Sequence, residues 1–252
     1  MKPNWIHLDT VSSTNSCLQE MLKRSKPPEW TVVVADYQEL GRGQGAHVWL
    51  SERNQNLLMS VLLYPEFLSV SLQFQLSIMT SLAVCDTLQD LEISPVIKWP
   101  NDILTEKGKI AGILIEHGIM GGQLSHSILG IGLNVNQLRF PGFPLRATSL
   151  AMEKPGHFDI RGLSKLLTDK LMSRYLQLLD GGGEPLRDAY LNNLFSLNKT
   201  VRFKAEGKEF TGVIRGISEI GELLVESEGT IRGYGLHSLT YSQNERGSMR
   251  RS

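Results

Sequence analysis

KIAGILIEHGIMGGQLSHSILGIGLNVN, residues 109–136, is the stretch of sequence that decides the fold. Two segments rich in apolar and β-branched residues, 109–115 and 125–133, lie on either side of Met120-Gly121-Gly122. Adjacent glycines between two such segments are typical of a hairpin connection. Because short connections favour antiparallel neighbours, the stretch predicts two antiparallel strands.

Further strands and several helices surround this pair. Valine-rich and other apolar segments predict strands over residues 5–8, 31–37, 57–64 and 96–99. Helical spacing predicts helices over residues 69–91, 159–179 and 185–197, and another that the Ser13 hydroxyl caps and Pro27-Pro28 stop. Helices are grouped after runs of strands, so the order favours an α+β fold, with a mixed, largely antiparallel sheet flanked by helices.

The C-terminal part of the chain has a different character. Short strands are expected over residues 200–204, 209–217, 221–226 and 230–234, with glycines between and within them. This spacing indicates a small β-barrel. We therefore predict a larger domain over residues 1–197, the barrel over residues 198–242, and a flexible polar tail over residues 243–252.

Charge and composition limit the function. The chain has 26 lysines and arginines against 26 acidic residues, whereas affinity for nucleic-acid phosphates needs a basic surplus. Cys17 and Cys85 stand among apolar residues, which favours buried free thiols over a disulfide. The six histidines are scattered, so we expect no zinc site.

The N-terminus and the longest apolar runs indicate where the protein works. The first residues lack the apolar core of a signal peptide, and the apolar runs are strand-sized, far short of a membrane span. No helix-turn-helix fits before Trp5, so we expect no N-terminal DNA-reading domain and no DNA partner. These features predict a cytoplasmic protein without a membrane partner. Residues 125–133 are hypothesised to form an edge strand for docking or for a homodimer.

The usual nucleotide motifs are missing. The sequence contains no P-loop, and the glycines at 41–45 and at 130–132 each lack the third glycine of the dinucleotide fingerprint. The loop GRGQGAHVW, residues 41–49, is nevertheless unusual. Its alternating glycines let backbone N–H groups approach an anion, Arg42 adds a planar fork for carboxylate or phosphate, and Trp49 can stack on a flat ring. Alone, such a loop is also typical of a mobile surface turn.

Three strand-end motifs carry the other candidates. In KWPND, residues 98–102, Pro100 marks a strand end, which brings a cation and a base to the mouth of a strand. Lys109 opens a strand in which the small Gly112 leaves room for a neighbour, and Asn134 follows glycines that allow close backbone approach. Taken singly, each of these residues also fits an ordinary solvated or snorkelling side chain.

Together and in this order, the motifs resemble those of biotin protein ligases. The resemblance runs from Ser13-Thr14-Asn15 through Gln38, the glycine loop and KWPND to KIAG at 109–112 and GIGLNVN at 130–136. It extends to about residue 197, and the small barrel matches the family's usual ending. KWPND followed by KxAGIL is a highly specific combination. The resemblance implies the class II synthetase-like biotin/lipoate ligase fold with a Src-homology-3-like barrel, in the short type without a DNA-binding domain.

The resemblance also implies roles for the motif residues. Biotin is expected at Ser13, Thr14, Asn15, Gln38, Arg42, Gly43, Gln44, Lys109 and Gly112. The nucleotide is expected at Gly41, Arg42, Gly43, Trp49, Asn101 and Asn134. The residues expected to act in catalysis are Asp102, Lys109, Arg42 and Lys98. No protein ligand for a metal is identified.

The implied activity uses ATP and Mg²⁺ to form biotinyl-5'-AMP, and then transfers biotin to a lysine of a biotin carboxyl carrier protein. A carboxylate that approaches the triphosphate meets like charge, at about 4 kcal/mol per contact near 4 Å for an effective dielectric of 20. Arg42, Lys98, Lys109 and Mg²⁺ are expected to offset this repulsion. A lysine with an ordinary pKa of about 10.4 must lose a proton to attack, and Asp102 is expected to accept it.

One departure and two alternatives accompany this interpretation. Family members often carry GRGRRGRxW, whereas this chain has Gln44, Gly45, Ala46 and His47 in the middle of the loop. We hypothesise that the adenylate leaks more readily than in arginine-rich relatives. The alternatives are a lipoate or octanoate ligase or transferase of the same fold and a non-catalytic biotin-binding module. The loop and the barrel favour biotin, and the retention of Lys98, Asp102 and Lys109 favours an enzyme.

Overall fold

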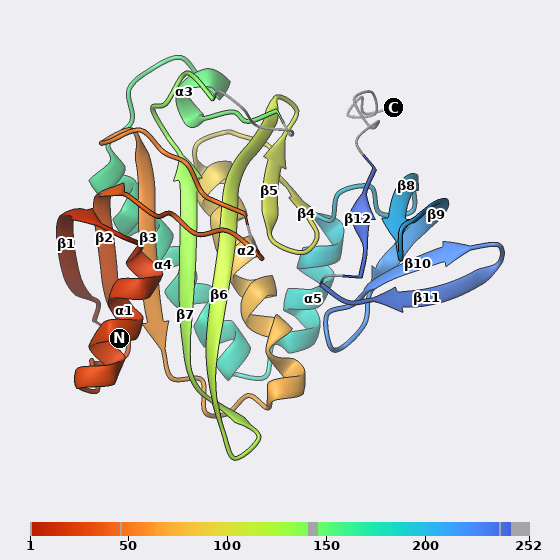
Figure 1. Ribbon diagram of the computed structural model, residues 1–252, viewed down its shortest axis with the longest axis horizontal. Coiled ribbons are helices and arrows are strands. Elements are labelled where there is room, and N and C mark those ends of the chain that lie inside the picture. Colours follow the sequence, from red (N-terminus) through yellow and green to blue (C-terminus); the bar gives the residue numbers. More distant parts are fainter. Residues whose placement is uncertain (1, 46, 141–145, 237, 243–252) are drawn as a thin grey trace.

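The computed structural model describes residues 2–45, 47–140, 146–236 and 238–242. The tail predicted over residues 243–252 and Ala46 of the glycine loop lie outside the described residues. Two sheets and their helices make up the described chain (Figure 1).

The larger sheet has seven strands in the order β1-β2-β3-β7-β6-β5-β4. Their bounds are β1 (Asn4–Val11), β2 (Thr31–Gln38), β3 (Asn56–Leu63), β4 (Val96–Lys98), β5 (Asp102–Thr105), β6 (Gly108–Met120) and β7 (Gln123–Asn134). β1 and β2 pair in parallel, and the other neighbours pair antiparallel. The predicted α+β fold class with a mixed, largely antiparallel sheet is confirmed.

The hairpin that the sequence predicted joins β6 to β7. Gly121 and Gly122 have φ angles of 61° and 81°, the left-handed conformation that a tight turn between antiparallel strands requires. The expectation that residues 125–133 form an edge strand is wrong. β7 lies between β3 and β6 and pairs with both, so the ends of the sheet are β1 and β4. Central strands collect the longest apolar runs because both of their faces are covered.

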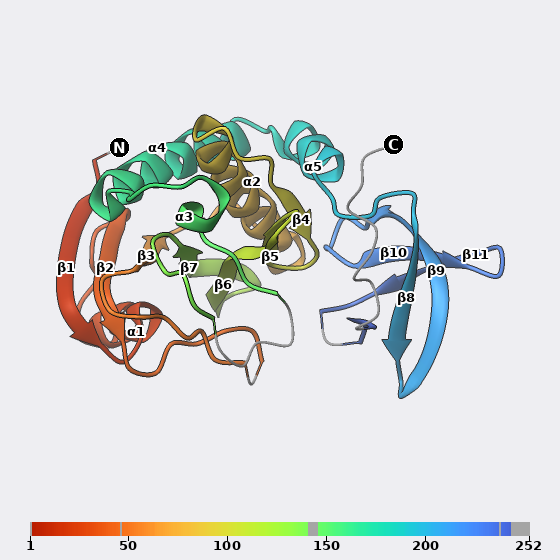
Figure 2. The same cartoon turned by 90° about the horizontal axis from the view of Figure 1, so that it is seen from above.

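Helices cover the two faces of the sheet unequally (Figure 2). α2 (Phe74–Asp90) and α4 (Ile160–Leu179) lie on one face, beside α5 (Gly183–Asn192), and α1 (Thr14–Arg24) lies on the other. The short elements η1 (Val70–Leu72) and α3 (Leu150–Glu153) complete the helical part. α1 buries Leu18 against one residue from each of three strands: Val33, Leu62 and Ile128. This second core is small, so the rest of the sheet surface beside α1 carries polar residues and glycines.

One predicted cap and the bounds of two helices differ from the prediction. Ser13 precedes α1, but its side chain makes no capping hydrogen bond, whereas Asp159 accepts one from the backbone of Arg161 at 3.0 Å and caps α4. The helix expected over residues 69–91 starts only after η1. The helix expected over residues 185–197 ends at Asn192, because Leu194 forms a bridge with Ile97 of β4 instead. Tertiary pairing overrides the local helical spacing there.

The second sheet has five antiparallel strands in the order β11-β10-β9-β8-β12. They are β8 (Thr200–Ala205), β9 (Lys208–Ile217), β10 (Leu223–Ser227), β11 (Thr230–Tyr234) and β12 (Thr240–Tyr241). Buried residues of this sheet, Phe203 and Ile214 among them, belong to the same apolar cluster as α2. The Trp99 indole N–H also donates to the carbonyl of Gly221 at 2.9 Å. The small sheet is therefore anchored directly behind the KWPND motif.

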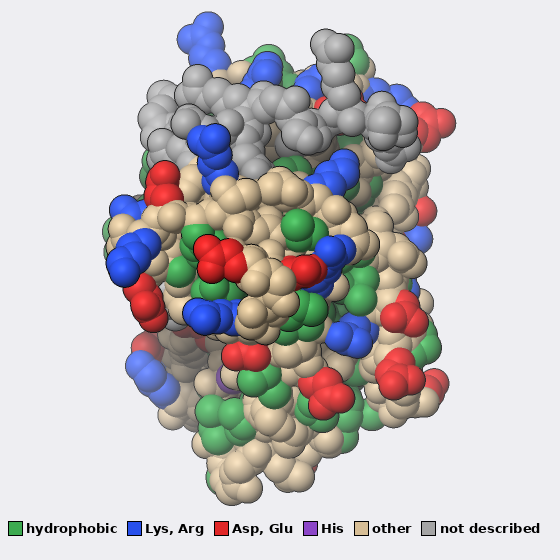
Figure 3. Space-filling view, turned by 90° about the vertical axis from the view of Figure 1, so that its right-hand side faces the viewer, with side chains coloured by type: hydrophobic (Ala, Val, Ile, Leu, Met, Phe, Trp, Pro, Cys, Tyr) green, Lys and Arg blue, Asp and Glu red, His purple; other side chains and the backbone are tan. Residues whose placement is uncertain are grey.

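The face of the molecule that carries the small sheet bears charges of both signs. Figure 3 shows lysine and arginine side chains interspersed with aspartate and glutamate there. Cys17 and Cys85 are both free thiols. Across the described residues, no helix is both long and apolar enough to cross a lipid bilayer.

Candidate functional site

Glycines replace side chains where β6 and β7 face α1. Cβ atoms built at these positions would meet neighbours too closely: at Gly130, 2.3 Å from the Asn15 Oδ1, and at Gly132, 2.4 Å from the Trp49 ring. At Gly112 the distance to the Trp49 ring would be 2.9 Å. Side chains from α1 and from the glycine loop therefore lie directly on the backbone of the sheet. These three positions are called the glycine floor below.

A buried hydrogen-bonded chain lies at one end of the glycine floor. The Gln38 Oε1 accepts a bond from the Thr14 backbone N–H at 2.8 Å and lies 3.1 Å from the Thr14 hydroxyl. The Ser60 hydroxyl lies 2.7 Å from the Thr14 hydroxyl and 2.6 Å from the Asn15 Oδ1. Thr14, Asn15 and Ser60 are all buried. Three residues predicted from the sequence, Thr14, Asn15 and Gln38, are thus brought together.

Glu116 of β6 continues this chain. Its Oε2 accepts a bond from the Asn15 Nδ2 at 2.7 Å. The Arg42 guanidinium donates to both of its carboxylate oxygens, at 2.7 Å to Oε1 and 3.3 Å to Oε2. The fork that the sequence assigned to a substrate carboxylate or phosphate is therefore filled by a carboxylate of the protein itself.

A charged pair lies at the other end of the glycine floor. The Lys109 Nζ is 2.5 Å from the Asp102 Oδ1, and the side chains are 28% and 16% exposed. β5 and β6 bring them together because Asp102 lies opposite Gly112 in the register. The Lys109 Nζ also lies 5.6 Å from the centre of the Trp49 ring, within range of a cation–π contact. A cation from KIAG, a base from KWPND and the indole of the glycine loop thus meet in one place.

The glycine loop forms a small hairpin among its described residues. The Gly43 N–H donates to the carbonyl of His47 at 2.8 Å, and the Trp49 N–H donates to that of Gly41 at 2.9 Å. These two N–H groups are therefore committed to the loop itself, in contrast to the anion-binding nest expected from the sequence. The loop positions Trp49 over the glycine floor, and a Cβ at Gly41 would lie 2.2 Å from the Trp49 carbonyl oxygen.

Lys98 takes another direction. It ends β4 and lies opposite Asp102 in the register, but its Nζ lies 4.7 Å from the centre of the Tyr241 ring in the C-terminal sheet. The structure therefore brings Asp102 and Lys109 together and directs Lys98 toward β12. Trp99, its neighbour in the motif, is buried and contributes to the core.

The two asparagines assigned to the nucleotide make bonds within the protein. The Asn101 Nδ2 donates to the Ile113 carbonyl at 2.9 Å, and the Asn134 Nδ2 donates to that of Thr148 at 2.9 Å. Both side chains hold neighbouring segments in place beside Lys109. Their contact with a nucleotide remains a prediction.

His117 follows Glu116 on β6 and therefore points to the other face of the sheet. Burial lowers the pKa of this imidazole to about 4, and its Nδ1 lies 2.8 Å from the Ser127 hydroxyl. At neutral pH the imidazole is uncharged and contributes no charge behind the site. Among the described residues, no group of three or more histidine, cysteine or acidic side chains could hold a metal ion.

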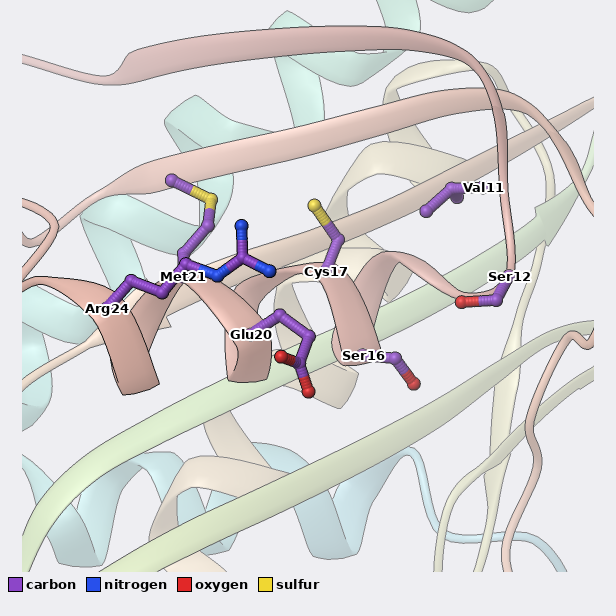
Figure 4. Close-up of a pocket in the computed structure, with 7 residues that line it drawn as sticks. All are labelled: Val11, Ser12, Ser16, Cys17, Glu20, Met21 and Arg24. Carbon is purple, nitrogen blue, oxygen red and sulfur yellow. The ribbon is translucent and has the colours of Figure 1, made fainter.

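A shallow pocket lies on the outer side of α1, away from the glycine floor (Figure 4). Its lining includes Val11, Cys17, Met21 and Arg24, and it contains none of the predicted site residues. Burial raises the pKa of the Cys17 thiol, which makes this sulfur a poor nucleophile. The pocket therefore adds no chemistry to the site.

Two residues of the site were missed from the sequence. Ser60 is a single hydroxyl in the apolar strand NLLMSVLL, and Glu116 is a single acid after the apolar run KIAGILI. Strand alternation carried a usable signal, because residues 112, 114 and 116 share one face of β6. A lone polar residue on the glycine-lined face could have been assigned to the site on that ground.

Comparisons with known proteins match both parts of the chain. A model of the biotin/lipoate A/B protein ligase family matches residues 8–134, and a model of the biotin protein ligase C-terminal domain matches residues 196–235. The "Bifunctional ligase/repressor BirA" of Bacillus subtilis is 31% identical over 237 residues, which cover 92% of this chain and 72% of that protein.

Two further relatives match most of their own length as well. The "Biotin--[acetyl-CoA-carboxylase] ligase" of Mycobacterium tuberculosis is 29% identical over 233 residues, covering 89% of this chain and 85% of the relative. Among solved structures, the biotin protein ligase from Aquifex aeolicus in complex with biotin and ATP aligns with a TM-score of 0.79 and 30% identity. That alignment covers 95% of this chain and 99% of the other.

Proposed function

Because this chain belongs to the biotin/lipoate A/B protein ligase family, we propose that it joins biotin to a lysine of a biotin carboxyl carrier protein. ATP serves as the second substrate, and biotinyl-5'-AMP is the intermediate. Relatives named as biotin--[acetyl-CoA-carboxylase] ligases and a relative bound to biotin and ATP support this activity.

The observation that carries the proposal is the contrast between the two ends of the glycine floor. One end offers uncharged hydrogen-bonding groups from Thr14 and Ser60, which are buried, and from Gln38, and the other offers the Lys109–Asp102 pair. Biotin has the matching polarity, with an uncharged cyclic urea at one end and a carboxylate at the other. The floor between them has no side chains of its own and is covered by the Trp49 ring, so the apolar part of the ligand would lie against the indole.

Activation takes place at the charged end. Lys109 attracts the biotin carboxylate and then stabilises the negative charge that develops as the carboxylate attacks the α-phosphate of ATP and pyrophosphate leaves. Asp102 is the acid of this pair. The described residues contain no group of three or more histidine, cysteine or acidic side chains that could hold a metal ion. Mg²⁺ binds proteins through one or two carboxylates together with substrate phosphates, so Asp102 and the ATP phosphates would hold it here. When bound, the ion neutralises phosphate charge.

Transfer then uses the same pair in a different role. The acceptor lysine must lose a proton before its amine attacks the acyl carbon and AMP leaves. Asp102, at 16% exposure, is within reach of solvent and of an incoming side chain, and it accepts that proton. Trp49 covers the glycine floor and limits the access of water to the adenylate.

A lipoate ligase of the same fold is the nearest alternative. The C-terminal region favours biotin, because residues 196–235 match a model described as the biotin protein ligase C-terminal domain. Pyrophosphate exchange measured with biotin and with lipoate separates the two. Exchange with lipoate alone would overturn the assignment.

The decisive experiment is a complete reaction. The full chain is incubated with ATP, magnesium, biotin and a biotin-carrier domain, and the carrier is analysed by mass spectrometry. We expect the mass of one attached biotin on a single lysine, and none when ATP is omitted. A carrier domain whose acceptor lysine is replaced by arginine is the matched control. Binding of biotin without any transfer would instead indicate the non-catalytic module.

A further inference from the structure

Glu116 is an unassigned member of the site, and its bonds fix the orientation of a neighbouring amide. An ionised carboxylate only accepts hydrogen bonds, so the Asn15 group that faces it must be the NH₂ group. The Asn15 Nδ2 indeed donates to the Glu116 Oε2 at 2.7 Å and to the Leu114 carbonyl at 3.2 Å. The Asn15 Oδ1 is thereby turned toward Ser60.

The direction of every following bond depends on that orientation. The Asn15 Oδ1 has no hydrogen, so the 2.6 Å contact with Ser60 uses the single hydroxyl proton of Ser60. The 2.7 Å contact between Ser60 and Thr14 must then use the Thr14 proton. The Thr14 hydroxyl proton thus has two acceptors within range, Ser60 at 2.7 Å and the Gln38 Oε1 at 3.1 Å, and the shorter contact is the stronger.

The hydrogen-bonded chain of side chains ends at Gln38 with a defined pattern of donors and acceptors. The Gln38 Oε1 is held by the Thr14 backbone N–H at 2.8 Å, so the Gln38 Nε2 points away as a donor. Within the described residues this Nε2 has no hydrogen-bond acceptor. The Thr14 hydroxyl donates to Ser60, and its oxygen keeps a free lone pair that can accept a hydrogen bond. A donor beside an acceptor complements the carbonyl and N–H groups of a cyclic urea.

We propose that Glu116 is a positioning residue that sets the direction of the Asn15–Ser60–Thr14–Gln38 chain and thereby selects the urea ring of biotin. It acts through Asn15, and its ion pair with Arg42 holds the carboxylate in place. This inference rests on the proposed function. It adds a specificity determinant on β6 that lies outside the sequence motifs.

The test compares biotin with 2-iminobiotin, in which a nitrogen donor replaces the urea oxygen. Dissociation constants for both ligands are measured on the full chain by calorimetry, for the parent and for Glu116→Gln. A glutamine side chain can both donate and accept, so it no longer forces one direction. We expect biotin to bind about tenfold more weakly, the cost of one charge-assisted bond, with no loss for 2-iminobiotin.

The ratio of the dissociation constant of 2-iminobiotin to that of biotin should therefore fall. Loss of the negative charge alone would disfavour the cationic analogue and raise the ratio, so the two effects have opposite signs. An unchanged ratio, or an equal loss for both ligands, overturns the proposal. Failure of the parent to bind biotin would instead overturn the proposed function.

Two further variants keep the test independent of folding. Ser60→Ala removes one hydroxyl in the middle of the chain and should lower the ratio to the same extent. Its combination with Glu116→Gln should add nothing more, because both act on one network. Full additivity overturns the proposal. The matched control is Glu226→Gln, which removes a strand glutamate that pairs with Arg215 at 2.6 Å in the small sheet and should leave the ratio unchanged.

Discussion

The two ends of the glycine floor differ in how complete they are. At the Gln38 end, Thr14, Asn15, Ser60 and Glu116 are already connected by hydrogen bonds and mostly buried. At the other end, Lys109 and Asp102 pair with each other and remain within reach of solvent. The difference shows that the groups for recognition are already fixed by the fold. Lys109 and Asp102, by contrast, must give up their contact with each other in order to contact the substrates. Binding energy for an uncharged ring needs fixed geometry, while charge transfer needs groups that can change partners.

Replacing Lys109 should cause the largest loss of activity at the reacting end. Lys109→Ala removes the positive charge that faces the developing negative charge, and we expect adenylation to fall about a thousandfold. Biotin-dependent pyrophosphate exchange measures this step. Lys170→Ala is the control, because Lys170 forms a similar ion pair with Asp90, at 2.7 Å, far from the floor. Equal rates for Lys109→Ala and the parent would remove Lys109 from the mechanism.

Replacing the base should separate the two steps. Asp102→Asn keeps the shape of the side chain but accepts a proton poorly, so we expect transfer from preformed adenylate to fall about a hundredfold. Rapid-quench measurement of single-turnover transfer to a carrier domain reports this step. Affinity for biotin should change much less, since the ring lies at the other end. A variant that transfers at the parental rate would show that another group takes the proton.

Filling the floor should weaken binding without touching either end. In Gly132→Ala the new Cβ would lie 2.4 Å from the Trp49 ring, so the indole must shift away from the floor. We expect the KM for biotin to rise about tenfold, with a smaller change in kcat, because the cost of overpacking falls mainly on binding. Gly235→Ala, where the Cβ has open space, is the control. A normal KM would mean that the ligand does not lie on this floor.

Adding charge to the loop should have the smallest effect. Gln44→Arg restores an arginine that relatives often carry, and an exposed ion pair with the adenylate is worth at most about 1 kcal/mol. We expect release of the adenylate to slow by up to about fivefold. Gly45 is the poorer position for this test, because its φ of 63° strains any larger residue. An unchanged release rate would contradict the hypothesis of a leaking intermediate.

Local patterns were sufficient for much of the fold. The Gly121-Gly122 turn and the antiparallel strands on either side of it follow from turn chemistry and alternation, which act within a few residues. β5 and β12 escaped prediction because strands this short carry little periodicity. The edge strand expected at residues 125–133 was wrong because neighbour order in a sheet is set by contacts between distant segments.

The same division applies to the site. The sequence by itself determined which chemical groups are available: a lysine beside small residues, an acid after Pro100, and a loop with one arginine and one tryptophan. Only the tertiary structure decided their partners. Lys109 pairs with Asp102, and Arg42 pairs with Glu116. Lys98 lies over the ring of Tyr241. The physical reason is range. Propensities and turns act between neighbours in the chain, whereas an ion pair depends on where β4, β5 and β6 place side chains across the sheet.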